Sequence, residues 1–236
     1  MTALASPGLV LRGVQPPLAL RDYGLAAFDM DSTLISIECI DEVAAAAGLK
    51  DEVAAITEAT MRGRIADFKE SLRRRCALLA GVPAGALQEV FDARLRYNPG
   101  VEAFVAAVRA AGLKTLLVSG GFTFFSDRVA AHLGIDFTRA NVLEIVDGRL
   151  TGGLVTQPWG DICDGAEKRR MLLQTCARLG LDPARAIAVG DGANDLPMMA
   201  AAGLSIAFHA KPAVRERAMI SVEDGGMDRV LEVLRP

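Results

Sequence analysis

The sequence LAAFDMDST, residues 25–33, gives the clearest indication of the fold of this chain. Its first four residues form a short apolar run, and such runs are typical of strands that are covered on both faces of a parallel sheet. The run ends at Asp29, and polar residues follow it. Ligands of open α/β sheets bind outside the carboxyl ends of the strands, so this turn is where a functional site is expected.

Three further apolar runs have the same form, at residues 115–118, 186–189 and 204–207. Amphipathic patterns between the runs predict helices over 101–111, 124–133, 167–179 and 196–202. An alternation of strands and helices predicts an α/β fold with a doubly wound parallel sheet.

Residues 37–97 interrupt this alternation, because they contain no run that is typical of a strand. Four helical patterns separated by glycines follow one another there, and we interpret the segment as a helical-bundle cap inserted after the first strand. The catalytic core then comprises 23–36 and 98–236, and residues 1–22 are a lead-in without an assigned role. Asp147-Gly148, flanked by β-type residues, predicts a hairpin over 142–155.

The composition is that of an ordinary globular protein and excludes several kinds of function. Charged residues make up 23%, the net charge is −3, and no long basic run occurs, which argues against nucleic acid and anionic membranes as partners. The four cysteines form no C-x-x-C pair, as in cytoplasmic proteins with reduced thiols. With two histidines, a multi-histidine metal site is excluded, so a metal must be a hard cation on oxygen ligands.

Polar residues follow three of the predicted strands. Asp29 and Asp31 follow the first, Ser119-Gly120-Gly121 the second, and a turn over 190–195 with Asp191 the third. A single aspartate after a strand is most often a helix N-cap, but that explanation does not account for the set. Asp29 and Asp191 would repel each other unless a cation lay between them, and Mg²⁺ prefers one or two carboxylates plus water and phosphate oxygens.

This set of residues fits phosphoryl transfer. A carboxylate such as Asp29 beside Mg²⁺ can attack phosphorus and form an aspartyl-phosphate. Asp31 is placed to protonate the leaving alkoxide and then to deprotonate the hydrolytic water. Ser119 and the next two amides, which we expect to open a helix, form an anion cradle. A lysine is still needed to offset charge, and spacing alone does not choose among the basic residues 168–170.

Four motifs in this order resemble those of the haloacid dehalogenase superfamily of phosphatases: D-x-D-x-T, a serine after a strand, a downstream lysine and G-D-G-x-N-D. The longer strings DMDSTLISIECIDEVA (29–44), SGGFTFF (119–125) and VGDGANDLPM (189–198) are similar to the phosphoserine-hydrolysing members of that family. The similarity runs from about residue 29 to the C-terminus. It implies a magnesium-dependent phosphatase acting on phosphoserine in serine biosynthesis.

The resemblance also implies a role for each motif residue. Asp29 is the nucleophile and Asp31 the general acid and base. Mg²⁺ is held by the carboxylates of Asp29 and Asp191 and by the main-chain carbonyl of Asp31. Asp195 supports the metal shell or the lysine. The remaining residues bind the phosphoryl group or the substrate: Ser119, Gly120, Gly121, Lys168 and Asn194.

The cap is where the ammonium and carboxylate groups of phosphoserine are expected to bind. Glu38 can take the ammonium, although a helix-start carboxylate facing the helix dipole is the alternative. Arg75 can hold the carboxylate in a bidentate pair, and it lies two helical turns after Phe68 and so on the same face. The resemblance adds Met61 and Phe68 as apolar contacts, for which core packing is the alternative.

Three other functions stay open. The same aspartyl-phosphate can pass its phosphoryl group to an alcohol such as homoserine, and cap closure decides between the two acceptors. A phosphatase for another small metabolite would not depend on Arg75. A non-enzymatic receiver-like module has no use for Asp31 or for a cap. We expect a monomer or homodimer acting on a small molecule, and the sequence does not distinguish Mg²⁺ from Mn²⁺.

Overall fold

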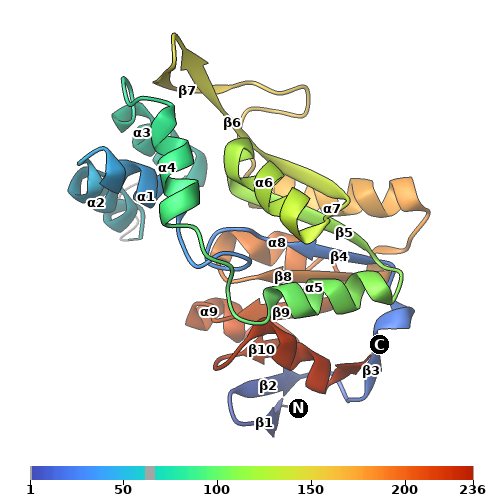
Figure 1. The fold of residues 1–236 in the computed structure, drawn as a ribbon. Coiled ribbons are helices and arrows are strands. Elements are labelled where there is room, and N and C mark those ends of the chain that lie inside the picture. The colour runs from blue at the N-terminus through green and yellow to red at the C-terminus, as the bar shows by residue number, and fades with distance from the viewer. Residues whose placement is uncertain (1, 62–66, 236) are drawn as a thin grey trace.

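The computed structural model describes residues 2–61 and 67–235 and contains a nine-stranded sheet in the order β1-β2-β10-β9-β8-β4-β5-β6-β7 (Figure 1). From β10 to β6 neighbouring strands are parallel, which confirms the predicted sheet. These strands are β4 (Leu25–Phe28), β5 (Lys114–Phe122), β6 (Phe137–Val146), β8 (Ala186–Gly190), β9 (Leu204–Phe208) and β10 (Ile220–Val222).

Helices cover both faces of this sheet. Successive side chains of a strand point to opposite faces, and the side chains of the central strands are apolar on both, so both faces need a cover. In β4, Ala26 and Phe28 belong to one hydrophobic core, while Leu25 and Ala27 belong to the other. The first core includes α5 (Val101–Ala110) and α6 (Thr123–Leu133). The second includes α7 (Gly165–Leu179), α8 (Leu196–Met199) and α9 (Pro212–Arg215).

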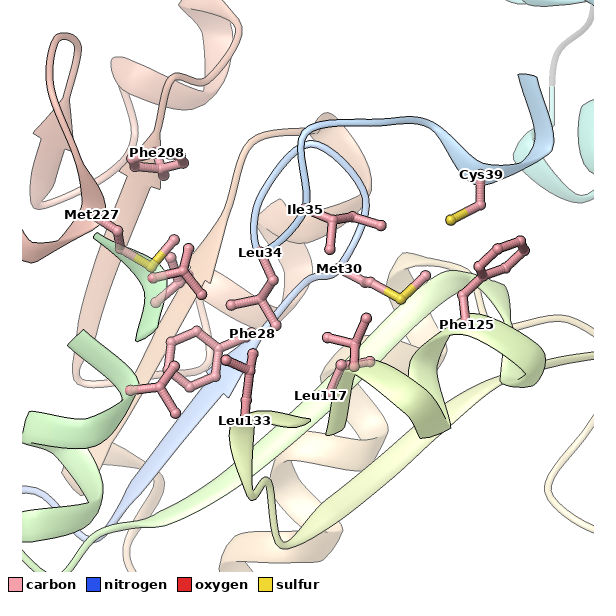
Figure 2. Close-up of a cluster of buried hydrophobic side chains, with 14 of the residues drawn as sticks. Phe28, Met30, Leu34, Ile35, Cys39, Leu117, Phe125, Leu133, Phe208 and Met227 are labelled. Atoms are coloured by element: carbon pink, nitrogen blue, oxygen red, sulfur yellow. The ribbon is translucent and has the colours of Figure 1, made fainter. Parts of the chain in front are cut away.

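The turn after β4 is anchored by its own apolar residues. Met30, Leu34 and Ile35 are fully buried beside Phe28, and Figure 2 shows their side chains pointing into one cluster. The Phe28 ring in turn meets Phe104 edge to face, at 6.1 Å between centroids. Burial of these residues holds the polar residues of the same turn in a fixed position.

Within the described parts of the predicted cap, four helices form a bundle at one end of the molecule, away from both termini (Figure 1). They are α1 (Cys39–Ala46), α2 (Lys50–Met61), α3 (Phe68–Leu78) and α4 (Gly85–Ala93). The Asp67 side chain caps α3 by accepting a hydrogen bond from Lys69 N. We keep the boundaries at residues 37 and 97 as a proposal.

The predicted hairpin is present as β6 and β7 (Arg149–Val155), which pair antiparallel. Asp147 and Gly148 at its turn have positive φ angles of 48° and 73°, the conformation that Asp-Gly hairpin turns require. The hairpin also touches the cap, because Gly81 N donates to Leu150 O and Leu150 N donates to Val82 O. The hairpin is therefore hydrogen-bonded to the loop between α3 and α4.

The segment 1–22, to which the sequence assigned no role, contributes strands. β1 (Thr2–Ser6) and β2 (Leu9–Arg12) form a hairpin, and β2 pairs antiparallel with β10. A short β3 (Leu18–Ala19) pairs with β11 (Leu234–Arg235). None of the helices in the described ranges combines the length and the apolar character that a membrane crossing requires.

Candidate active site

A cavity of about 600 Å³ lies where the carboxyl ends of the central strands face the cap. All the predicted site residues with described side chains line it, except Lys168 and Asp195, which are fully buried. The Met61 side chain lies outside the described part of the structure. The predicted residues in the wall are Asp29, Asp31, Glu38, Phe68, Arg75, Ser119, Gly120, Gly121, Asp191 and Asn194.

Strand register brings Asp29 and Asp191 together. Phe28 in β4 is paired with Val189 in β8, and β8 continues for one more residue, to Gly190, so Asp29 and Asp191 both follow their strands at the same edge of the sheet. Asp29 N then donates to Val189 O at 3.0 Å, and the residue is 5% exposed. The nucleophile predicted from the sequence is therefore held at the floor of the cavity by the backbone of its neighbour.

Lys168 lies directly beneath Asp29. Its Nζ is 2.7 Å from Asp29 Oδ1 and 2.7 Å from Asp195 Oδ1, and the residue is fully buried. Burial alone would lower the pKa of Lys168, but the two carboxylates raise it above its usual value, so the ammonium stays charged. The neighbouring Arg169 and Arg170 are exposed, so Lys168 is the one of these three basic residues that contacts Asp29.

The helix start places this lysine. Asp164 caps α7 by accepting from Glu167 N at 2.9 Å, and Lys168 follows in the first turn. A charged side chain at that position has to find partners inside the molecule, because the helix packs against the sheet. Asp29 and Asp195 are those partners.

Asp195 organises the turn after β8. Its Oδ2 accepts from Asp191 N at 3.2 Å and from Gly192 N at 3.0 Å, while Oδ1 holds Lys168. A Cβ at Gly190 would lie 2.4 Å from the Asp195 carboxyl carbon, so only glycine fits there. Both oxygens of Asp195 are thus engaged, as expected of a supporting residue.

The carboxylates in this corner suit a hard divalent cation. Asp29, Asp191 and Asp195 each place an oxygen within 4.8 Å of the others. Burial and the nearby Asp195 raise the pKa of Asp191 to about 6, and they raise the pKa of Asp29 well above its ordinary value. One lysine does not offset three carboxylates, and a cation bound to Asp29 and Asp191 would.

Asp31 faces the cavity from the turn after β4. Its Oδ2 accepts from Cys39 N at 3.4 Å, and its buried Oδ1 has no hydrogen-bond partner within the described residues. Burial, followed by repulsion from Glu38, raises the pKa of Asp31 to about 7. A carboxyl group with this pKa carries a proton for part of the time at neutral pH, which suits a general acid.

The phosphate-binding strand end differs from the prediction in one respect. Gly120 and Gly121 were expected to open a helix, but β5 continues through them to Phe122 and α6 begins at Thr123. The strand can extend because Asn141 Nδ2 donates to Gly120 O at 2.8 Å. Ser119 Oγ accepts from Gly121 N at 2.8 Å, so its own proton is free to be donated.

The cap supplies the opposite wall. Glu38 precedes α1 and accepts from Ser32 Oγ at 2.8 Å. Arg75 and Phe68 both line the cavity from α3, as their spacing predicted. The Phe68 ring rests against the main chain at Gly120, because a Cβ there would lie 2.8 Å from Phe68 Cζ. Cap and core therefore meet directly above the strand end.

Several supporting residues had no role in the sequence prediction. Thr33 Oγ1 donates to Asp191 Oδ1 at 3.0 Å, although Thr33 belongs to the quoted motif. Asn98 Nδ2 donates to three carbonyls of the turn after β4, those of Ser32, Thr33 and Ile35. An asparagine far along the chain carries no signal of such contacts. Lys211 also lines the cavity, while His209 Nε2 lies 2.9 Å from Gly225 O.

Comparisons with known proteins agree with this geometry. The family model of haloacid dehalogenase-like hydrolase matches residues 26–200. Phosphoserine phosphatase of Albidiferax ferrireducens is 66% identical over 100% of this chain and 99% of its own length, and that of Polaromonas sp. is 64% identical over 98% of each. A solved phospho-aspartyl intermediate analogue of phosphoserine phosphatase is 35% identical, with a TM-score of 0.82 over 90% of this chain and 99% of its own.

Proposed function

The chain belongs to the haloacid dehalogenase-like hydrolases, and we propose that it hydrolyses O-phospho-L-serine to L-serine and phosphate in serine biosynthesis. One observation carries the chemistry: Lys168 holds Asp29 at the base of a cavity that Asp31 also faces. The relatives that share nearly the whole length of the chain have the same activity in their names.

The first step forms a bond between Asp29 and phosphorus. Lys168 occupies Asp29 Oδ1, which leaves Oδ2 to attack the phosphoryl group of the substrate. The bond from phosphorus to the serine oxygen breaks, and Asp31 gives its proton to that oxygen. The products of this step are serine and a phosphorylated Asp29.

The second step releases phosphate. Asp31, now ionised, takes a proton from a water molecule, and the resulting hydroxide attacks the phosphorus of phosphorylated Asp29. The bond between Asp29 and phosphorus breaks, which returns the free carboxylate. Lys168 and the Ser119 hydroxyl offset the charge that collects on the phosphoryl oxygens in both steps.

We assign Mg²⁺ to the carboxylates of Asp29 and Asp191 and to the main-chain carbonyl of Asp31. When bound, this ion supplies positive charge that neutralises the phosphoryl oxygens. Thr33 orients Asp191 through its hydrogen bond, and Asp195 orients the turn that carries Asp191. Asn194, in the cavity wall, contacts phosphate or substrate.

The cap selects the substrate. Phosphoserine carries an ammonium and a carboxylate beside its phosphate, and the cavity wall offers Glu38 for the first and Arg75 for the second. Phe68 covers the apolar part. The four cysteines are buried and unpaired, which supports a location in the reducing cytoplasm. We expect a monomer or a homodimer.

The decisive experiment measures phosphate release from phosphoserine by the purified protein with Mg²⁺, beside a panel of phosphorylated sugars and amino acids. We expect phosphoserine to be preferred, Asp29→Asn to be inactive, and Arg75→Ala to lose about 10²-fold in kcat/KM for phosphoserine. Added homoserine tests the phosphotransferase alternative through phosphohomoserine formation. Full activity of Asp29→Asn would contradict the mechanism, and preference for another metabolite would contradict the substrate.

A further inference from the structure

Two buried polar atoms on the cap side of the cavity lack hydrogen-bond partners within the described residues. They are Asp41 Oδ1, an acceptor on α1, and Arg75 Nε, a donor on α3. Both residues line the same cavity. An unsatisfied buried polar group costs about 1–3 kcal/mol, so two complementary ones facing one space call for a functional explanation.

A role of Asp41 in starting α1 does not explain its position. The residue lies in the first turn of α1, where a carboxylate commonly accepts a hydrogen bond from the helix start. Here the N-cap side chain makes no capping hydrogen bond and Asp41 Oδ1 accepts none. Burial raises the pKa of Asp41, and Arg75 is the strongest influence that opposes this rise. Among the basic residues near Asp41, Arg75 therefore has the strongest electrostatic interaction with its carboxylate.

We propose that Asp41 is a positioning residue for Arg75 and thereby determines recognition of the substrate carboxylate. When substrate fills the cavity, Asp41 accepts the hydrogen bond of Arg75 Nε–H. The two terminal nitrogens of the guanidinium are then left free for a bidentate pair with the substrate carboxylate. Asp41 itself touches neither the phosphate nor the ammonium. This inference rests on the proposed function, because it needs a substrate that carries a carboxylate.

The test compares two substrates that differ only in the group at issue. Phosphoserine has the carboxylate, and phosphoethanolamine has the phosphate and the ammonium without it. For Asp41→Asn, which keeps the size of the side chain, we expect KM for phosphoserine to rise about tenfold with kcat within about twofold. The kcat/KM for phosphoethanolamine should stay at the wild-type value.

A double-mutant cycle adds a second readout. In an Arg75→Ala background, Asp41→Asn should have no further effect on phosphoserine, because the residue through which it acts is gone. The matched control is Asp51→Asn, at the first turn of α2, where the side chain is exposed and outside the cavity wall. It should change neither substrate.

Two results would overturn the proposal. One is an equal loss with both substrates in Asp41→Asn, which would make Asp41 an ammonium acceptor or a structural residue. The other is additivity of the Asp41→Asn and Arg75→Ala effects. Failure of the proposed function looks different, because the wild-type protein itself would then not turn over phosphoserine.

Discussion

At the scale of single residues, the two aspartates separated by one position, for which we propose different roles, have different surroundings. Asp29 is paired with Lys168, whereas Asp31 has a buried oxygen without a partner in the described structure and lies near Glu38. At Asp29, Lys168 opposes the rise in pKa that burial and Asp195 cause, and a bound cation would oppose it too; at Asp31, repulsion from Glu38 adds to the rise that burial causes. These surroundings support the roles proposed for Asp29 and Asp31.

The pH dependence of the reaction should report this difference. In the proposed mechanism Asp31 must carry a proton to release serine, so kcat/KM for phosphoserine should fall as the pH rises through the pKa of Asp31, which is raised to about 7. 4-Nitrophenyl phosphate has a leaving group that needs no proton, and its profile should lack this limb. Asp31→Asn should lose about 10²–10⁴-fold with phosphoserine. An identical limb for both substrates would count against Asp31 as the acid.

Thr33 offers a second test, because it touches the proposed metal site only through Asp191. Thr33→Val removes the hydrogen bond to Asp191 Oδ1 while keeping the shape of a fully buried side chain. We expect the Mg²⁺ concentration for half-maximal activity to rise about 10–100-fold, as for other residues that orient metal ligands. Thr33→Ser, which keeps the hydroxyl, serves as the control. An unchanged requirement in Thr33→Val would mean that Asp191 is oriented without it.

Sequence reasoning reached the charged residues of the site, including the supporting Asp195, and missed Thr33 and Asn98. Asp29, Asp31 and Asp191 follow apolar runs, and this position can be recognised from the sequence alone. Lys168 was chosen only by family resemblance, since its contact with Asp195 arises from the packing of α7 on the sheet. The contacts of Asn98 and Thr33 depend on tertiary structure in the same way.

At the scale of elements, the turn after β4 is tied to the segment that leads back from the cap. The Asn98 amide donates to three carbonyls of that turn, and Asn98 N donates to Leu34 O at 3.0 Å. Asn98→Ala should therefore lower the free energy of unfolding by about 1–3 kcal/mol, because carbonyls inside the fold lose their donor. Urea denaturation measures this loss. Asn98→Asp, which cannot donate when ionised, should be equally unstable, and a stable variant would contradict this role.

The elements themselves were predicted with uneven success. The strands β4, β8 and β9 are buried on both faces, so their apolar runs mark them clearly. The extension of β5 through Gly120 and Gly121 was missed, because glycines in a run read as a turn and the stabilising Asn141 lies elsewhere in the chain. The short strands near the N-terminus were missed; β2 pairs with β10 and β3 pairs with β11, and both partners are distant in sequence.

At the scale of the whole molecule, the N-terminal hairpin closes one edge of the sheet. Leu11 is 2% exposed and opposite Ile220 of β10, so its side chain belongs to the main core. Leu11→Ala should lower the free energy of unfolding by about 2–5 kcal/mol while kcat/KM at low temperature stays unchanged. Val10→Ala, at a more exposed position, should cost less. Unaltered stability of Leu11→Ala would make the hairpin a dispensable appendage.

The proposed metal site should couple catalysis to the stability of the entire fold. Without the ion, the pKa of Asp191 is raised to about 6, and burial and Asp195 also raise the pKa of Asp29 well above its ordinary value. The folded state then binds protons more tightly than the unfolded state. The stability of the metal-free protein should therefore fall as the pH rises from about 4 through about 6.

Mg²⁺ binds the ionised carboxylates, so protons compete with it and its effect should have the opposite slope. At a concentration about 100 times Kd the ion adds about 2.7 kcal/mol of stability, which corresponds to a Tm increase of about 5–10 °C for a chain of this size. We expect that increase at pH 7.5 and little of it at pH 5. Asp191→Asn should lose the increase at both pH values, whereas Asp51→Asn should keep it. A pH-independent increase that survives in Asp191→Asn would place the ion elsewhere, and the carboxylates at the strand ends would then need another source of positive charge.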